Sequence, residues 1–300
     1  MTAIARRPAS HVVCRFGLDT TDGLEHLRLE SGRDFPIALT PEALRQFSGP
    51  QLAIPDLPTT RDARLLEALS ARHPALSDEH GWSAHFGREL NASDDKACWS
   101  EMRPRTLPVI EGKHLDPFVV HLDRVTKLAS RAAVRARLGS SAVFDRPRLA
   151  YREVAAATNR LTLIAAILPV GTISVHTVFC LRTAMAVDEQ DVLCALLNSF
   201  VANYLVRRWV TTHVTASIVE RLPVPRLPPG TPLFDAIAAG ASRLRAGERP
   251  SDLVANVHAQ AARAYGINGD DYAYILDSFP LIPAGERAAA LRAFTNGTPQ

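Results

Sequence analysis

The segment from Leu196 to Pro225 concentrates arginine, hydroxyl and proline residues in one short stretch, LLNSFVANYLVRRWVTTHVTASIVERLPVP. Guanidinium groups bind phosphate oxygens and guanine edges, and short polar side chains hydrogen-bond to phosphates or bases. Proline cannot donate a backbone hydrogen bond, so the closing Leu-Pro-Val-Pro is expected to end a strand and hold the loop. The alternative is a solvent-exposed helix end followed by an edge strand. The candidate contact residues are Arg207, Arg208, Thr211, Thr212 and His213.

A second concentration of positive charge lies in the middle of the chain. Residues 101–160 hold twelve Arg or Lys against six Asp or Glu, a local +6 in a chain whose net charge is +3. Such a run is typical either of a solvated helix face or of a nucleic-acid surface. Four of these cations have i, i+3 or i+4 spacing and are predicted to share a helix face: Arg124, Lys127, Arg131 and Arg135. The candidate contacts in this region are Lys113, Arg131, Arg135, Arg146 and Arg148.

One short pattern is compatible with catalysis. Glu111 and Lys113 follow an apolar run in VIEGK, Asp56 lies upstream, and Asp94-Asp95-Lys96 repeats the acid-x-Lys spacing. Metal-dependent nucleases use carboxylates to hold Mg²⁺ and a lysine beside the attacking water or the phosphate. The pattern is short and generic, so a nuclease that uses Glu111 and Lys113 is kept as an alternative.

Composition indicates a soluble globular protein, with 47% hydrophobic and 22% charged residues. The four cysteines form no Cys-x-x-Cys pair, so we expect buried thiols in a reducing cytoplasm and no metal site. The N-terminus lacks the apolar core of a signal peptide. Residues 161–181 are uncharged and long enough to span a bilayer, but Pro169-Val170-Gly171 predicts a turn in a buried hairpin instead. We therefore expect no membrane association.

Periodicity and capping signals predict the elements that position these residues. We expect a helix over 60–73 and a strand over 107–112. Asp116-Pro117 is typical of a helix start, and Gly139 of its end. Three strands are expected within 148–181. A helix with an inward apolar stripe is expected from Asp188, and a helical tail after Pro228.

Three segments, in this order, resemble the C-terminal target-recognition half of type II adenine-N6 DNA methyltransferases, the TaqI-like specificity domain. They are LPVIEGKHLDPF (107–118), RLAYREVAAATNRLTLIAAILPVGTISVHT (148–177) and LCALLNSFVANYLVRRWVTTHVTASIVERLPVP (193–225). Related halves close fused restriction-modification enzymes and phage-defence methyltransferases. The flanking segments FGRELNASDD (86–95) and AYGINGDDYAYILDSFPLIP (264–283) are similar to segments of the same proteins.

The resemblance implies an α/β (α+β) protein with a mixed sheet, packed helices and a helical C-terminal tail. It divides the chain into an N-terminal mixed segment (1–100), a DNA target-recognition domain (101–228) and the tail (229–300). Such enzymes also carry a glycine-rich methyl-donor loop and an Asn-Pro-Pro-Tyr-type motif, and this sequence contains neither. We therefore expect a non-catalytic chain without a cofactor that reads double-stranded DNA. S-adenosylmethionine would be held by a partner methyltransferase domain or subunit. A protein-interaction module is the third alternative.

Overall fold

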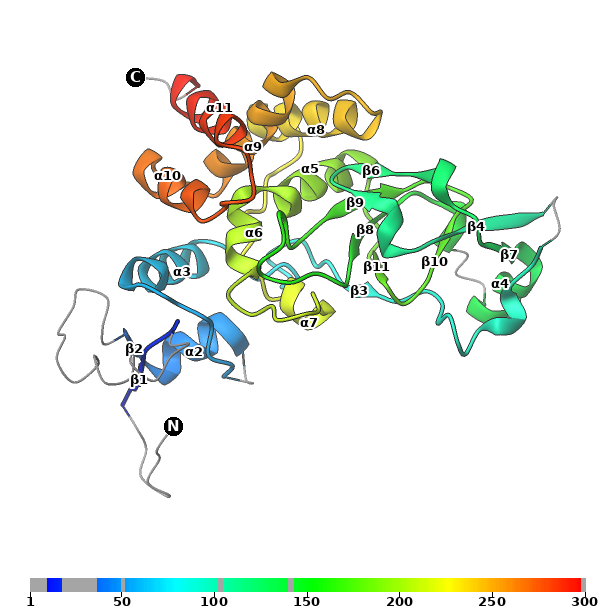
Figure 1. Cartoon of the computed structure of the whole chain (residues 1–300), viewed down its shortest axis with the longest axis horizontal. Coiled ribbons are helices and arrows are strands. Elements are labelled where there is room, and N and C mark those ends of the chain that lie inside the picture. Colours follow the sequence, from blue (N-terminus) through cyan, green and yellow to red (C-terminus); the bar gives the residue numbers. More distant parts are fainter. Residues whose placement is uncertain (1–9, 18–36, 50–51, 102–104, 140–142, 298–300) are drawn as a thin grey trace. The chain divides into compact units, whose positions relative to one another are not determined.

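The computed structural model divides the chain into two compact units, Met1–His73 and Pro74–Gln300 (Figure 1). The residues that it describes are 10–17, 37–49, 52–101, 105–139 and 143–297. The division lies before the boundary expected at residue 100, because β3 (Phe86–Gly87) pairs with β11 (Val178–Leu181). That pairing makes residues 74–100 part of the second unit.

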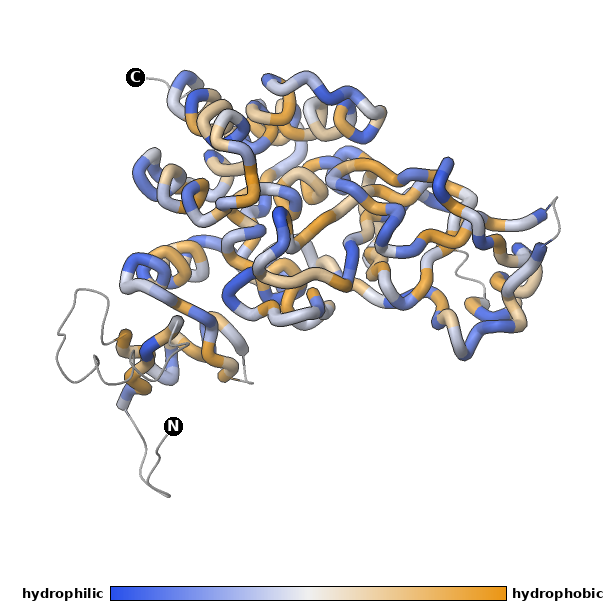
Figure 2. Tube along the Cα trace, in the orientation of Figure 1, coloured by the Kyte–Doolittle hydropathy of each residue, from blue (hydrophilic) through white to orange (hydrophobic). Residues whose placement is uncertain are grey.

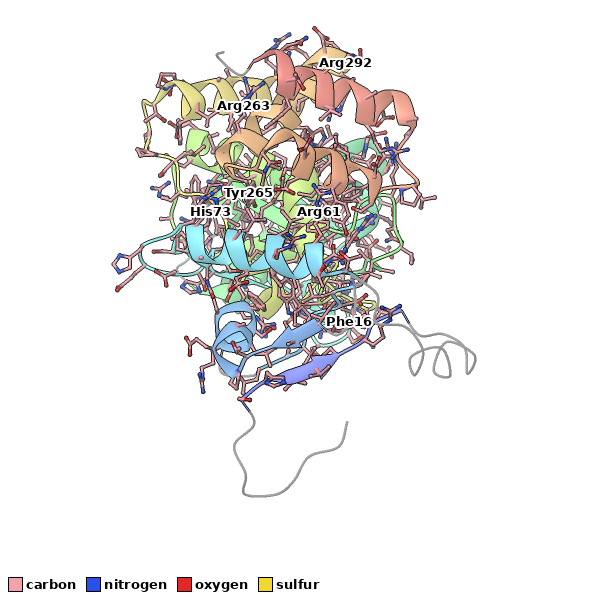
Figure 3. The ribbon with its side chains drawn as sticks, turned by 90° about the vertical axis from the view of Figure 1, so that its left-hand side faces the viewer. Phe16, Arg61, His73, Arg263, Tyr265 and Arg292 are labelled. Carbon is pink, nitrogen blue, oxygen red and sulfur yellow. The ribbon has the colours of Figure 1, made fainter. Side chains whose placement is uncertain are left out.

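The first unit combines a two-stranded antiparallel sheet with two helices. Helix α3 begins as its sequence predicts, since Thr59 and Asp62 form a reciprocal capping box. Figure 3 labels Arg61 and His73 near the two ends of this helix. Its buried face consists of leucines at helical spacing: Leu65, Leu66 and Leu69. The elements of this unit are β1 (Val12–Cys14), β2 (Ile37–Leu39), α2 (Pro41–Ser48) and α3 (Thr60–Arg72).

A four-stranded antiparallel sheet forms the centre of the second unit. Its order is β3–β11–β8–β9, with β8 spanning Arg148–Arg152 and β9 spanning Ala165–Leu168. Tyr151 of β8 is fully buried and stacks on Phe179 of β11, with ring centroids 5.6 Å apart. The three longer strands are buried along almost their whole length, which agrees with their continuous apolar sequences.

A smaller sheet has the order β10–β4–β7, with β10 (Ile173–Ser174) parallel to β4 (Thr106–Ile110) and β7 (Leu128–Ser130) antiparallel to it. The predicted strand at 107–112 is thus confirmed. The predicted hairpin over 161–181 is wrong, although its turn is present. β9 pairs with β8, whereas β10 pairs with β4, so the two halves of this segment belong to different sheets.

The helix expected from Asp116 to residue 138 is also wrong in its first half. Asp116 instead belongs to a short hairpin of β5 (Leu115–Asp116) and β6 (Val119–Val120), whose turn places Phe118 at φ 68°. The Phe118 backbone N–H donates to the carbonyl of Ala165 on β9. Tertiary pairing therefore overrides the local helix-start signal. The α-helix of this span, α4, covers Arg131–Leu138 and ends at Gly139 with φ 73°, as the sequence predicts.

The helix expected from Asp188 forms as two helices, α5 (Val187–Asn198) and α6 (Phe200–Val206), with Ser199 between them. Ser199 caps α6 by accepting a hydrogen bond from Ala202 N–H. From Gln190 to Val206 every residue is buried, rather than one stripe, because α5 packs between the sheet and α8 and α9. In Figure 2, α5, α6 and the strands of the central sheet are coloured largely as hydrophobic.

The helical tail after Pro228 is confirmed. Arg263 joins two of its helices by donating to the carbonyls of Ala293 and Phe294, at 2.5 and 2.6 Å (Figure 3). None of the described helices is long and apolar enough to cross a membrane. The remaining helices are α7 (Ala216–Val219), α8 (Pro232–Arg245), α9 (Ser251–Ala264), α10 (Gly269–Asp277) and α11 (Ala284–Asn296). Short 3-10 turns span Lys96–Cys98, Gly112–His114, Leu122–Arg124 and Val143–Asp145.

Candidate nucleic-acid interface

The loop Thr211–His213 lies exposed at the end of the central sheet. Its backbone is attached to the segment that follows β8. Ala155 N–H donates to the Thr212 carbonyl at 3.3 Å, and Val214 N–H donates to the Glu153 carbonyl at 2.7 Å. The three side chains of the loop therefore face solvent from a backbone that is held in place. The strand that was expected to end at Pro223 and Pro225 is wrong, because helix α7 (Ala216–Val219) follows the loop.

Thr177 connects that segment to the turn after β4. Its carbonyl accepts from Glu153 N–H, and its hydroxyl Oγ1 accepts from Gly112 N–H, both at 3.0 Å. A Cβ atom at Gly112 would lie 2.8 Å from Cγ of Arg152, so only glycine fits this close approach. Three segments far apart in the sequence are thus held together at one end of the sheet.

Glu111 connects two lysines beside Gly112. Its carboxylate lies 2.7 Å from Nζ of Lys113 and 3.1 Å from Nζ of Lys127. Burial tends to raise the pKa of Glu111, but hydrogen bonds and charge from both lysines outweigh it, so its pKa is lowered. The carboxylate is therefore ionised at neutral pH and neutralises part of the positive charge. Both lysine side chains remain exposed.

These hydrogen-bonded loops form one surface, which we call the loop ridge. Arg88 adds a cation by pairing with Glu153 at 2.8 Å. Arg152 contributes a half-buried guanidinium whose Nε has no hydrogen-bond partner among the described residues. The ridge holds five cations against the two carboxylates of Glu111 and Glu153. Its members are Arg88 and residues 111–113, 124–127, 152–155, 176–177 and 211–213.

Arg148, a predicted contact, is not on the surface. It is 1% exposed, and its guanidinium forms a two-point ion pair with Glu89, which is 6% exposed. The guanidinium also donates to the Thr172 carbonyl at 2.9 Å, while Glu89 accepts from Ser174 N–H at 2.7 Å. The prediction is wrong because a buried carboxylate, invisible as a partner in the sequence, draws this arginine into the core.

Arg207 is likewise a structural residue. It donates to the carbonyls of Asn159 and Ser278, at 2.5 and 3.1 Å, and to the Thr162 hydroxyl at 3.1 Å. Its guanidinium lies 4.0 Å from the Phe279 ring centroid. Burial, together with the neighbouring Arg208, lowers the pKa of Arg207 to about 10, so it stays charged at neutral pH. These bonds use its donors internally, and the expected phosphate contact of Arg207 stays a prediction.

The remaining predicted cations lie in other settings. Arg208 is half-buried over the Tyr204 ring, 4.6 Å from its centroid. Arg131 and Arg135 share one carboxylate, Asp145, at 3.2 and 2.8 Å. They share a face of α4, but Arg124 and Lys127 precede that helix, so the predicted four-residue helix face does not form. Of the other candidates, Arg146 donates to the Arg182 carbonyl at 3.1 Å.

The acidic residues of the nuclease alternative have other partners. Glu111 binds two lysines, and Asp95 is 6% exposed and pairs with Arg137 at 2.6 Å. Asp56 belongs to the first unit. Across the described ranges, no group of three or more His, Cys, Asp or Glu side chains is placed to hold a metal ion. The carboxylate set that the alternative needs is therefore not assembled in the described part of the chain.

Two buried asparagines, which were not among the predicted residues, position the strand next to the ridge. Asn203 Oδ1 accepts from the backbone N–H groups of Thr162 and Leu163, and Asn198 Oδ1 accepts from that of Ala165, all at 2.9 Å. They attach α5 and α6 to the segment that leads into β9. The sequence signal for these two residues was an amide side chain within an otherwise apolar helix. A buried amide needs hydrogen-bond partners, so such a residue indicates a contact with another segment.

Comparison with known proteins gives only weak similarity to this chain. No protein-family model and no curated protein matches it. Among solved structures, the chain is similar to the Type IIL restriction-modification enzyme MmeI in complex with DNA, at 14% identity and a TM-score of 0.39. The match covers 71% of this chain but only 35% of that one, so this chain spans about a third of its length. A likeness this weak does not establish a shared fold.

Proposed function

We propose that the second unit recognises a specific sequence in double-stranded DNA, as the target-recognition module of an adenine-N6 DNA methyltransferase or restriction-modification system. The observation that carries the proposal is the loop ridge, where exposed cations and hydrogen-bonding side chains stand on loops fixed by backbone hydrogen bonds. A DNA-reading surface needs both kinds of group, because phosphate contacts set position and base contacts set sequence. The order of the sequence segments that resemble specificity domains supports the same assignment.

Each part of the ridge suits one of these two roles. Lys113 and Lys127 are exposed cations on long side chains, which suits contact with phosphates. Thr212 and His213 are exposed hydrogen-bonding side chains, and their backbone is bonded to the segment that follows β8, which suits contact with base edges in a groove. A rigid scaffold behind exposed loops is a common arrangement for binding residues.

The lysines provide the test of the phosphate role. In the double variant Lys113→Gln/Lys127→Gln, duplex affinity should fall, and the log-log salt slope should shrink by about 0.9 for each phosphate that is no longer neutralised. Glu111→Gln should have the opposite effect, because it releases both lysines from their carboxylate. Fluorescence anisotropy of a labelled duplex at several salt concentrations measures both, with the methyltransferase partner present if the chain binds weakly alone.

The matched control is Arg243→Gln, which removes an exposed cation paired with Glu248 in the helical tail. It should leave the slope unchanged. Equal slopes for the wild type and the double lysine variant, with both folded by circular dichroism, would remove the ridge from the interface. Mg²⁺- or Mn²⁺-dependent cleavage of the duplex that is lost in Glu111→Gln would instead favour the nuclease alternative.

We assign the methyl donor to another domain or subunit, since the sequence lacks the donor loop and the Asn-Pro-Pro-Tyr motif. Calorimetry of the full chain with S-adenosylmethionine should show no binding, and no methyl group should be transferred to DNA. Micromolar binding of the donor by this chain alone would contradict this assignment. That result would not bear on DNA binding by the loop ridge, which the salt-slope measurement tests separately.

A further inference from the structure

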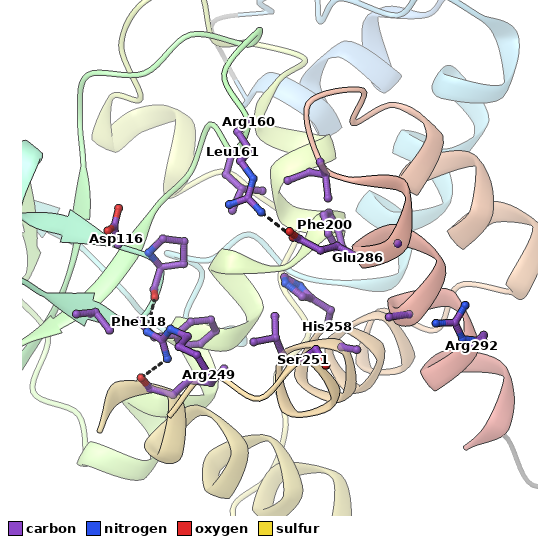
Figure 4. A pocket seen from close by; sticks show the side chains of 18 of the residues that line it. Asp116, Phe118, Arg160, Leu161, Phe200, Arg249, Ser251, His258, Glu286 and Arg292 are labelled. Atoms are coloured by element: carbon purple, nitrogen blue, oxygen red, sulfur yellow. Dashed lines mark hydrogen bonds and ion pairs between the residues drawn. The ribbon is translucent and has the colours of Figure 1, made fainter. Parts of the chain in front are cut away.

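A cavity of about 740 Å³ lies between the β5–β6 hairpin and the helical tail (Figure 4). Its apolar wall includes Phe118 of the hairpin, Leu161, Phe200 of α6 and Ile282. The volume falls within the range of about 300–1,000 Å³ that is usual for small-molecule sites. None of its lining residues belongs to the loop ridge. The cavity is therefore a separate feature from the proposed DNA surface.

Positive side chains surround this apolar wall. Arg160, Arg249 and Arg292 line the cavity, against the carboxylates of Asp116 and Glu286. Arg249 is held by backbone carbonyls, including that of Pro117 at 3.2 Å. Figure 4 shows these arginines at different sides of the cavity. The anionic group of a ligand could therefore contact any of several arginines in this cavity.

One ion pair at the edge of the cavity is open to exchange. Arg160 Nη2 lies 2.6 Å from Glu286 Oε2 across the gap between the 160 loop and the first turn of α11 (Figure 4). Both side chains are about half exposed, at 55% and 52%. Exposed ion pairs of this kind contribute little to stability. The carboxylate of Glu286 can therefore be replaced on Arg160 by an anion from a ligand.

His258 supplies a hydrogen-bonding edge inside the cavity. Its ring packs on Phe200, with centroids 4.3 Å apart and an interplanar angle of 31°. Burial, with a smaller contribution from the charge of Arg160, lowers the pKa of His258 to about 4. The imidazole is thus neutral at neutral pH and offers one donor and one acceptor. An apolar wall with flat rings and one polar edge suits a planar body.

We propose that this cavity binds a planar organic anion, with its flat body along the apolar wall beside the His258 imidazole and its anionic group on Arg160 in place of Glu286. A nucleoside monophosphate and an aromatic carboxylate share this chemistry. The probe for the first measurement is 8-anilinonaphthalene-1-sulfonate, an aromatic anion with a flat naphthalene ring, whose fluorescence rises in an apolar site. The full-length protein should bind it at one saturable site.

Two variants with opposite expected effects test the exchange. Glu286→Gln frees Arg160 and should tighten binding of the probe by about threefold, as expected for loss of a weak surface pair. Arg160→Gln removes the cation and should weaken binding by about threefold or more. The matched controls, Glu248→Gln and Arg243→Gln, break a similar exposed pair on residues that do not line the cavity and should change nothing.

Ala289→Phe, which fills the cavity from α11, should abolish the saturable site while the circular dichroism spectrum is unchanged. Adenosine monophosphate and indole acetate are then added as competitors, and the one that displaces the probe identifies the class of anion. The proposal is overturned if neither competitor displaces it. It is also overturned if the Glu286 and Arg160 variants bind the probe as tightly as the wild type. This second criterion does not depend on whether Ala289→Phe folds.

Discussion

The interior arginines Arg148 and Arg207 and the cations of the loop ridge belong to the same compact unit, yet they meet opposite environments. Arg148 lies against a buried carboxylate, and Arg207 is enclosed by backbone carbonyls and the Phe279 ring. Lys113 and Lys127 share one half-buried carboxylate and remain exposed. The same kind of charge thus stabilises the fold in one region and is presented to solvent in the other.

The difference shows that the acceptors around an arginine decide its role. A guanidinium has five N–H donors, so it can bind several carbonyls that a packed turn leaves without partners. Around Arg207 those carbonyls come from Asn159 and Ser278, on segments that meet only in the folded chain. The ridge lysines have fewer internal acceptors, and their long side chains keep the charge in water. Removing a residue should therefore affect stability in the interior and binding on the ridge.

The largest effect is expected for Arg148→Met. The substitution leaves Glu89 buried without its cation, which typically costs about 3–5 kcal/mol of unfolding free energy. Urea denaturation followed by tryptophan fluorescence measures this loss, since Trp82, Trp99 and Trp209 all lie in the second unit. Arg152→Met, at the ridge end of the same strand, is the control and should cost less than about 1 kcal/mol. Equal costs for the two variants would remove the distinction between interior and ridge.

Arg207→Met should have the next largest effect. It leaves the part-buried carbonyls of Asn159 and Ser278 without their donor, and a net loss of about 0.5–1.5 kcal/mol is expected for each hydrogen bond. The salt slope of duplex binding should not change, because this guanidinium is engaged internally. The same denaturation and anisotropy measurements apply, with Arg243→Met as the exposed control. A reduced slope with unaltered stability would place Arg207 on DNA and contradict its interior role.

His213→Ala should affect the protein least and its sequence preference most. The side chain is exposed, so unfolding free energy should change by no more than about 0.5 kcal/mol. If the imidazole contacts a base edge, discrimination at one position should fall by about 1–3 kcal/mol. Selection from a randomised duplex pool, performed for the wild type and for His213→Ala with the methyltransferase partner present, measures the loss of discrimination. His80→Ala removes another exposed histidine outside the ridge, and identical selected sequences for all three proteins would exclude a reading role.

Local signals were sufficient where an element is stabilised by its own sequence. The helix that begins at Thr60, the strand before Glu111 and the end of α4 at Gly139 were predicted, as were the helices of the tail. These local signals failed from Asp116 to Arg124, where an N-cap signal competes with the β5–β6 hairpin and with the hydrogen bond from Phe118 N–H to the Ala165 carbonyl. Of the candidate site, the exposure of Thr211 to His213 was predicted, because a polar loop ended by prolines has few ways to become buried.

The sequence by itself determined the α/β class, the helical tail, and the polar loop between α6 and Leu-Pro-Val-Pro, since composition, periodicity and turn residues act over short distances. Only the tertiary structure decided which cations face solvent. Arg148 and Arg152 occupy opposite ends of one strand, and the sequence does not distinguish them. The first meets Glu89 in the core, whereas the second lies beside Gly112 on the ridge. Burial of a charge depends on a partner brought close by the fold, and spacing along the chain carries no record of that partner.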